Sequence, residues 1–216
     1  MSLVYVSSAD APVAGRPPSA AFVVVLLHGY GSDERDLAGL AGYLPRGVPW
    51  VSVRAPLPHP AWGHAWYPIT VPGEPAVEAI AAATNALWGW IDAALPPDSM
   101  VVPIGFSQGG LMATQLLRTR PERIPAAAVL SGYVQDEPQA ADALLEQSRP
   151  PVFWGRGTQD AVIPAAAVEL AAEWLPRHAS LEERVYPGMG HSVCEDELVH
   201  LRRFVSAIRA GEPQGA

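Results

Sequence analysis

Residues 100–117 read MVVPIGFSQGGLMATQLL, and this stretch decides the fold. Its apolar run at 100–104 predicts a strand, although Pro103 weakens that prediction, and the run at 111–117 predicts a helix. Between them lies GFSQGG, a G-x-S-x-G match centred on Ser107. After a strand and before a helix, this motif forms a sharp turn that exposes a serine hydroxyl. The alternative is a glycine-rich connection that holds an incidental serine.

The rest of the chain alternates between the two kinds of element. Strands are predicted at 22–27, 50–53, 126–131, 151–155 and 181–186, the last of them polar enough to lie near a sheet edge. Helices are predicted at 74–95, 139–147, 164–175 and 195–208. This alternation predicts an α/β fold with a mostly parallel central sheet and helices on both faces. One domain is expected over 1–216, with its core at about 20–208 and a flexible tail at 210–216.

Composition narrows the function classes. The chain is 49% apolar, its formal net charge is −8, and all 14 of its basic residues are arginines. Without a basic run, nucleic acid is not expected as a partner. Cys194 is the single cysteine, and no Cys/His cluster has zinc-like spacing, so no zinc site is expected. The N-terminus does not resemble a signal peptide, and the longest apolar run, 20–27, is too short to span a bilayer. A cytoplasmic protein without stable membrane insertion is therefore expected.

Residues 55–75 are predicted to be irregular. The segment is rich in proline and carries Trp62, Trp66 and Tyr67. Long loops inside compact domains tend to be functional or disordered, and clustered aromatic rings argue against disorder. Two interpretations stay open, a flap over an apolar pocket and a surface Ω-loop packed by its own rings.

A serine nucleophile needs a histidine base, and His191 is the best candidate. It stands in the glycine-rich loop PGMGHS (187–192), directly after a predicted strand and before the last helix. Sites on open α/β sheets assemble from such loops at the carboxyl ends of strands. His178 lies at a helix end and His200 inside the last helix, where both are expected to have structural roles.

The base needs an orienting acid, and Asp160 is preferred. It ends GRGTQD (155–160), which follows a predicted strand, and it lies between the serine and the histidine in chain order. An aspartate at such a place also serves as a turn former or helix cap. Asp136 and Glu137 follow the preceding strand and are the alternatives.

The transition state of acyl transfer needs two N–H donors for its oxyanion. One is the backbone N–H of the residue after the nucleophile, Gln108. The other is expected from the loop HGYGSD (28–33) after the first long strand, where flanking glycines let the Tyr30 N–H point at the site. His28 precedes the serine in the chain, so it is interpreted as a structural member of that loop.

Four motifs in this order resemble one known family. LHGYG (27–31), GFSQGG, GTQD (157–160) and GHS (190–192) look like the phospholipase/carboxylesterase family of α/β-hydrolases. The resemblance covers about residues 20–208. It implies a single-domain α/β-hydrolase fold without a large cap domain and without a metal or cofactor. It also implies Ser107 as nucleophile, Asp160 as orienting acid, His191 as base, and Tyr30 and Gln108 as oxyanion donors.

Two departures from the family pattern concern substrate choice. A leucine is usual where Tyr30 stands, and Ser192-Val193 replaces the HEI-like ending that commonly follows the histidine. Trp66, Tyr67, Val162 and Val193 are the candidate pocket residues. A cysteine nucleophile would indicate the neighbouring dienelactone hydrolases, and Ser107 argues against them.

The sequence therefore predicts a serine hydrolase that cleaves short to medium acyl esters or thioesters through an acyl-enzyme. The first alternative is a lysophospholipase or acyl-protein thioesterase acting on long acyl chains. The second is a binding protein with the same fold and no turnover. Family members often form homodimers, but nothing in the sequence marks an interface.

Overall fold

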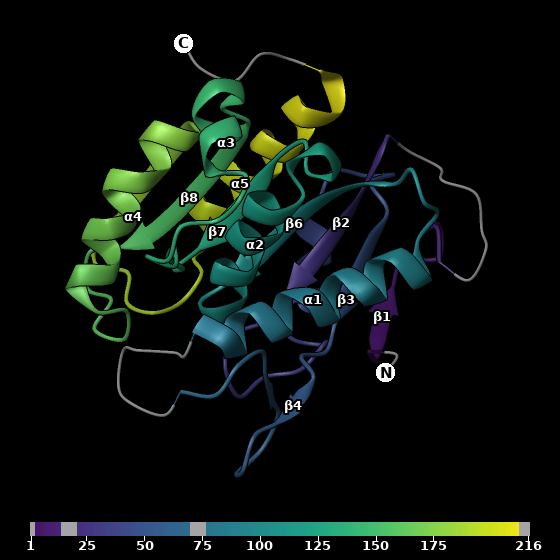
Figure 1. Ribbon diagram of the computed structural model, residues 1–216, viewed down its shortest axis with the longest axis horizontal. Coiled ribbons are helices and arrows are strands. Elements are labelled where there is room, and N and C mark those ends of the chain that lie inside the picture. Colours follow the sequence, from purple (N-terminus) through teal and green to yellow (C-terminus); the bar gives the residue numbers. More distant parts are fainter. Residues whose placement is uncertain (1–2, 14–20, 70–76, 212–216) are drawn as a thin grey trace.

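The computed structural model describes residues 3–13, 21–69 and 77–211 of the chain (Figure 1). A seven-stranded sheet forms its centre, and helices pack on both sides. The strands are β1 (Tyr5–Ser7), β2 (Phe22–Leu27), β3 (Trp50–Val53), β6 (Met100–Phe106), β7 (Ala127–Leu130), β8 (Pro151–Gly157) and β9 (Ser180–Tyr186). The helices are α1 (Val77–Ala94), α2 (Gln108–Thr119), α3 (Asp142–Ser148), α4 (Ala165–His178) and α5 (Glu195–Ala210), with short 3₁₀ helices η1 (Leu37–Tyr43) and η2 (Pro121–Arg123).

The strand order places the topological switch point of the sheet beside the G-x-S-x-G motif. The order is β1-β3-β2-β6-β7-β8-β9, and every neighbouring pair is parallel except β1 with β3. The chain moves outward in one direction from β2 and in the other from β6. In open α/β sheets, sites form at the carboxyl ends of the strands flanking such a switch. Here those ends carry residue 28 onward and Ser107.

Alternate side chains along each strand enter two separate cores. One core packs β-strand residues such as Val25, Val129 and Trp154 against α1, α2, α3 and α4. The other packs Val24 and Phe153 with their neighbours against η1 and α5. Full burial of a Val or Leu side chain contributes about 1.5–3 kcal/mol, so both faces of this sheet stabilise the fold. Figure 1 views the sheet from the side of α1 and α2, with α5 behind it.

The predicted fold class is confirmed, with differences at element ends. β2 and β3 have the predicted bounds, and β9 lies at a sheet edge as its polar sequence predicts. Pro103 is tolerated in β6 because it pairs with β2, whereas pairing with β7 begins one residue later at Ile104. The sequence analysis missed β1, whose three residues are too few for a periodic signal. The expected tail at 210–216 and the helix start at 74–76 lie largely outside the described residues.

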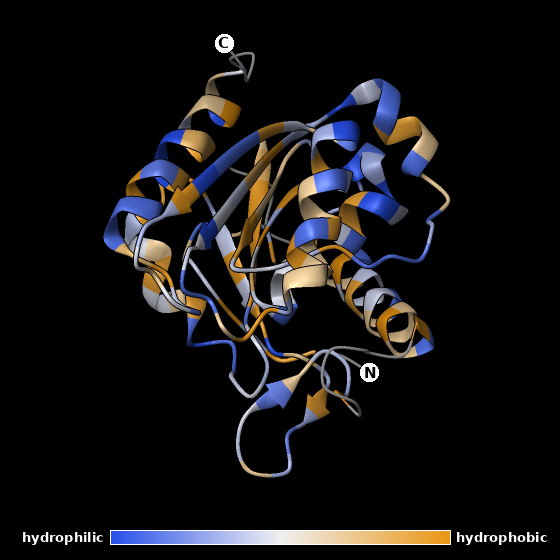
Figure 2. Ribbon diagram, turned by 90° about the vertical axis from the view of Figure 1, so that its left-hand side faces the viewer, coloured by the Kyte–Doolittle hydropathy of each residue, from blue (hydrophilic) through white to orange (hydrophobic). Residues whose placement is uncertain are grey.

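The prediction of an irregular segment at 55–75 was wrong for its first part. β4 (Leu57–Pro58) and β5 (His64–Ala65) form an antiparallel hairpin that stands out from the body of the molecule (Figure 2). Its turn is closed by the His59 N–H donating to the Gly63 carbonyl at 2.9 Å, and Gly63 adopts φ 72°. The hairpin is joined to the loop after β2, because the Gly31 N–H donates to the His64 carbonyl at 2.9 Å. Residues 70–75 lie outside the described residues.

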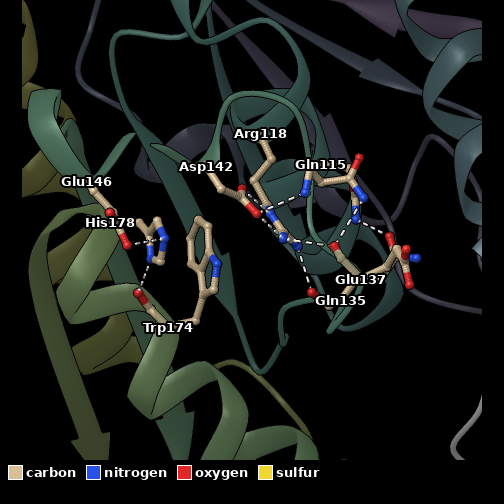
Figure 3. Close-up of polar contacts among 9 residues, drawn as sticks. Gln115, Arg118, Gln135, Glu137, Asp142, Glu146, Trp174 and His178 are labelled. Carbon is tan, nitrogen blue, oxygen red and sulfur yellow. Dashed lines mark hydrogen bonds and ion pairs between the residues drawn. The ribbon is translucent and has the colours of Figure 1, made fainter. Parts of the chain in front are cut away.

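A buried arginine joins α2 to the chain beyond β7. The Arg118 guanidinium donates to both carboxylate oxygens of Asp142, at 2.8 and 2.7 Å, and to the carbonyls of Gln135 and Glu137 (Figure 3). Burial disfavours an ionised Asp142, but hydrogen bonds, chiefly from Arg118, outweigh it and hold the pKa of that carboxyl below its ordinary value. Because the arginine is buried, this pair is far less screened than a surface ion pair.

Stacked rings extend this network to α4. The Trp174 ring lies between Arg118, whose guanidinium carbon is 4.7 Å from the ring centroid, and His178, whose ring is parallel at 4.0 Å (Figure 3). The His178 Nδ1 lies 2.8 Å from the Trp174 carbonyl and, since a carbonyl only accepts, carries the proton of that hydrogen bond. His178 therefore packs against Trp174 near the end of α4, whereas the sequence analysis assigned it a structural role at the helix terminus.

The network yields a prediction about stability. Arg118→Met should lower the free energy of unfolding by roughly 3 kcal/mol, because it leaves Asp142 and two carbonyls without their buried donor. Arg120→Met is the matched control, since Arg120 pairs with Asp92 at a partly exposed site and its loss should change stability by less than about 1 kcal/mol. Urea denaturation of the three proteins measures both values. Equal losses in the two variants would contradict the assignment.

Candidate active site

Ser107 occupies a strained turn between β6 and α2. Its φ of 55° and ψ of −117° lie in a region that non-glycine residues rarely adopt, and such strain persists only where the surroundings enforce it. The flanking glycines explain the enforcement. A Cβ at Gly105 would overlap the Gly109 carbonyl, and a Cβ at Gly109 would overlap the carbonyl of Leu27 in β2. The close approach of these backbones therefore fixes the turn and presents the serine hydroxyl.

His191 joins the serine to an acid. Its Nε2 lies 2.9 Å from Ser107 Oγ and its Nδ1 lies 2.8 Å from Asp160 Oδ2. A carboxylate only accepts hydrogen bonds, so Nδ1 carries the proton and Nε2 is left as an acceptor for the serine hydroxyl. The sequence placed all three residues in one site, and the structure brings them into a single hydrogen-bonded chain.

Asp160 is held ionised by several donors. Burial raises the pKa of its carboxyl, but the hydrogen bond from His191 and those from the Val162 and Ile163 N–H groups outweigh burial and hold that pKa below its ordinary value. The two N–H groups donate to Oδ1, at 2.9 and 3.1 Å, and Oδ2 is thereby directed to the imidazole. The alternatives Asp136 and Glu137 are both exposed, and the Glu137 carbonyl is engaged with Arg118.

The loop after β8 that carries Asp160 (the acid loop) and the loop after β9 that carries His191 (the base loop) are in direct contact. The Gln159 N–H donates to the Met189 carbonyl at 2.9 Å, and the Gly188 N–H donates to Thr158 Oγ1 at 2.9 Å. A Cβ at Gly157 would overlap the Met189 carbonyl, so glycine is needed for the approach. These contacts explain why β8 and β9, which are neighbours in the sheet, deliver Asp160 and His191 to the same place.

Two backbone N–H groups of residues beside the serine have no acceptor within the described residues. Tyr30 belongs to the loop after β2 and Gln108 opens α2, whose first N–H groups have no partner within the helix. Within residues 3–13, 21–69 and 77–211, neither N–H donates to another protein group. Both residues line the same cleft as Ser107, so the arrangement offers two donors to a developing negative charge.

His28 is structural, as the sequence predicts. Its Nε2 accepts the Ala55 N–H at 3.0 Å, so its Nδ1 donates to the Gly29 carbonyl at 2.7 Å. One neutral tautomer satisfies both bonds, and burial lowers the pKa of this imidazole, which keeps it neutral. The histidine thereby fixes the loop that carries Tyr30.

The side chain of Gln108 has a role that sequence reasoning missed. Its Oε1 accepts the Trp66 N–H at 2.8 Å, and its Nε2 donates to the Tyr67 carbonyl at 2.8 Å. The indole N–H of Trp66 donates in turn to the His28 carbonyl at 2.9 Å. The motif predicts only the role of the Gln108 backbone N–H. The two hydrogen bonds of its side chain, called here the Gln108 clamp, depend on the backbone path of residues 66–67, which the sequence does not indicate.

The cleft beside Ser107 has a volume of about 500 Å³ and is mainly apolar. Val162 lines it, as expected, together with Tyr30, Ile69 and Tyr133. The other candidate pocket residues are not among its lining residues. Trp66 and Tyr67 are fully buried in the first core, and Val193 is partly buried and packs against the second core.

A comparison with known protein families identifies the family of the chain. The family model described as Phospholipase/Carboxylesterase matches residues 10–209. The chain belongs to the phospholipase/carboxylesterase family. Membership confirms the predicted α/β-hydrolase fold and the predicted enzyme class, a hydrolase.

Relatives of the chain carry names from the same family. It is 25% identical to acyl-protein thioesterase 1 of Kluyveromyces lactis over 90% of this chain and 95% of that protein. It is 29% identical to carboxylesterase SOBER1 of Arabidopsis thaliana over 47% of this chain and 45% of that protein. The crystal structure of esterase PE8 superposes with a TM-score of 0.76 at 27% identity, covering 96% of this chain and all of that one. The Bacillus cereus carboxylesterase, at 22% identity and a TM-score of 0.77 over 94% and 93% of the two chains, shows the shared fold.

In the described part of this family member, no group of three or more His, Cys, Asp or Glu side chains is placed to hold a metal ion. Its helices are each too short or too polar to cross a bilayer.

Proposed function

We propose that the chain is a serine carboxylester hydrolase that cleaves short to medium acyl esters or thioesters. One observation carries the proposal, the His191 ring hydrogen-bonded through one nitrogen to Ser107 Oγ and through the other to Asp160. A serine hydroxyl is a weak nucleophile, and this arrangement supplies the base and the orienting acid that activate it.

The geometry supports a two-step reaction. Ser107 Oγ attacks the acyl carbonyl while His191 Nε2 takes the hydroxyl proton, and the imidazolium then protonates the leaving alcohol or thiol. Water repeats the sequence on the acyl-enzyme, with His191 as base again. The Tyr30 and Gln108 N–H groups stabilise the tetrahedral oxyanion, and one such donor is worth about 10²–10³ in turnover.

The lining of the cleft supports an uncharged acyl chain of modest length. A volume of about 500 Å³ is within the range of small-molecule sites, and the residues beside the serine are mostly apolar. Among the described residues, Asp36 is the only carboxylate that lines the cleft and no Lys or Arg lines it, which disfavours anionic substrates. Tyr30 limits the cleft where its ring packs edge-on against His59, with centroids 4.8 Å apart.

The nucleophile is tested by its removal. Ser107→Ala should abolish turnover of p-nitrophenyl acetate and butyrate while leaving the fold intact, because the serine hydroxyl is the only group lost. Circular dichroism checks the fold. Labelling by a fluorophosphonate probe separates an enzyme from a binding protein of the same fold, since an inert serine does not react. Unchanged turnover in Ser107→Ala would refute the proposal.

The acid is tested by a pair of amide substitutions. Asp160→Asn should reduce kcat by about 10⁴, because the amide favours the wrong imidazole tautomer, as in other triads. Asp136→Asn, on the exposed alternative, should leave kcat unchanged. If the second variant shows the large loss and the first does not, the acid has been assigned to the wrong loop.

Chain-length preference is expected to depend on Tyr30. Tyr30→Leu should raise kcat/KM for octanoate relative to acetate esters, by up to about fourfold for each additional methylene that the wider cleft buries. Acetate turnover should persist, because the oxyanion donor belongs to the backbone. Tyr43→Leu is the control, since Tyr43 is equally exposed but lies outside the cleft. A preference for palmitoyl esters in the unaltered protein would favour the long-chain alternative instead.

A further inference from the structure

Glu197 is a buried acid directly behind the loop that carries His191. It is the third residue of α5, after Glu195 and Asp196, and Cys194 caps the helix. Glu195 and Asp196 are exposed, whereas the exposed fraction of Glu197 is 0%. A glutamate is almost never fully buried unless it has a partner.

Neither carboxyl oxygen of Glu197 has a hydrogen-bond partner within the described residues. Among those residues, no arginine or histidine lies within ion-pair distance of it. From β8 it meets Gly155, where a Cβ would overlap Glu197 Oε1. Leu198 and Leu201, which follow Glu197 in α5, belong to the second core together with Leu37 of η1. Within the described residues, no cationic side chain would therefore compensate a negative charge on this carboxyl.

The titratable neighbours of Glu197 are few. From the end of β9 comes Tyr186, whose hydroxyl contacts His200 Nδ1 at 3.1 Å. Burial raises the pKa of Tyr186, so this phenol stays neutral in mildly alkaline solution. From the start of α5 come the Cys194 thiol and the Cys194 N–H, and this N–H lowers the pKa of the carboxyl without counting as a hydrogen-bond partner of either oxygen. An isolated buried carboxylate is unfavourable by several kcal/mol, and such a group keeps its proton instead.

Burial accordingly raises the pKa of Glu197 to about 8 and outweighs the opposing effect of the Cys194 N–H. The folded chain then holds a proton that the unfolded chain releases at about pH 4.5. The contribution of Glu197 to the free energy of unfolding is therefore fully present below about pH 4.5 and is lost as the pH rises to about 8.

Two connections lead from Glu197 to the base. Along the chain, the helix cap Cys194 is three residues after His191. Across the sheet, the Gly155 carbonyl accepts the Ser131 N–H at 2.8 Å, and Ser131 Oγ donates to the Ser192 carbonyl at 3.2 Å. Gly155, against which the carboxyl lies, is thus connected through the hydrogen bonds of Ser131 to Ser192, the residue next to His191.

We propose that Glu197 is a positioning residue that acts as a neutral acid, seating the first turn of α5 on Gly155 and thereby holding His191 against Ser107. Loss of its proton leaves an uncompensated charge that draws this turn toward solvent and moves the imidazole. The inference rests on the proposed role of His191 as base. It assigns an alkaline limit of activity to a group that touches no reacting atom.

The test is the pH profile of kcat/KM for p-nitrophenyl butyrate in four proteins, with the rate of Ser107→Ala subtracted. The unaltered protein should lose activity with an apparent pKa near 8, falling roughly tenfold or more by about pH 9.5. Glu197→Gln, neutral at every pH, should keep its activity over this range. Glu195→Gln removes an exposed charge from the same turn and should keep the alkaline loss. Cys194→Ser should also keep it, which excludes the neighbouring thiol.

Three results would overturn the inference. They are the absence of an alkaline loss in the unaltered protein, the same loss in Glu197→Gln, and a Glu197→Gln protein that does not fold at neutral pH, since the amide matches the neutral acid in shape. The melting temperature gives a second measurement, because it should fall between about pH 5 and 8 in the unaltered protein relative to Glu197→Gln. Turnover that survives Ser107→Ala would instead refute the proposed function and is seen separately.

Discussion

The backbone contact between the Ser107 turn and the end of β2 is the constraint on which the site depends. Gly109 lies so close to the Leu27 carbonyl that no side chain fits between them, and Gly105 lies equally close to Gly109. This contact holds Ser107 in a conformation that it would not adopt alone. It also sets the distance between the serine and the loop that carries Tyr30. One close approach therefore positions both the nucleophile and its oxyanion donors.

A second close approach between backbones brings the acid and the base to the serine. β2 and β6 flank the switch in chain direction, and β8 and β9 deliver the acid and the base from further along the sheet. Gly157 permits the acid loop to touch the base loop, as Gly109 permits the serine turn to touch β2. Because parallel strands end at the same edge, four loops far apart in the sequence converge without a cap domain in the described part of the chain.

Much of this could be predicted from the sequence because glycines and apolar runs are local signals. The G-x-S-x-G turn, the strands at 22–27 and 50–53, and the loops of Asp160 and His191 all follow from residues within about ten positions. The clamp of Gln108 on Trp66 and Tyr67 could not be predicted, since its partners are about 42 residues away and bond through backbone groups. The aromatic rings of 66–67 were assigned to the pocket, yet they lie in the core. Aromatic clustering indicates burial but not which surface is buried.

The polar groups buried around the site differ in whether their hydrogen-bonding atoms have partners, and the sequence does not show this difference. His28 and Gln108 satisfy each of their hydrogen-bonding atoms with backbone groups, and each thereby fixes a loop rigidly. Within the described residues, neither carboxyl oxygen of Glu197 has a hydrogen-bond partner, and Glu197 lies in the first turn of α5, the helix that follows the base. Satisfied groups rigidify a structure at every pH, whereas an unsatisfied acid stabilises it only while protonated. The loops fixed by His28 and Gln108 around Ser107 thus keep their positions regardless of pH. The position of His191, in contrast, depends on the protonation of Glu197 behind its loop.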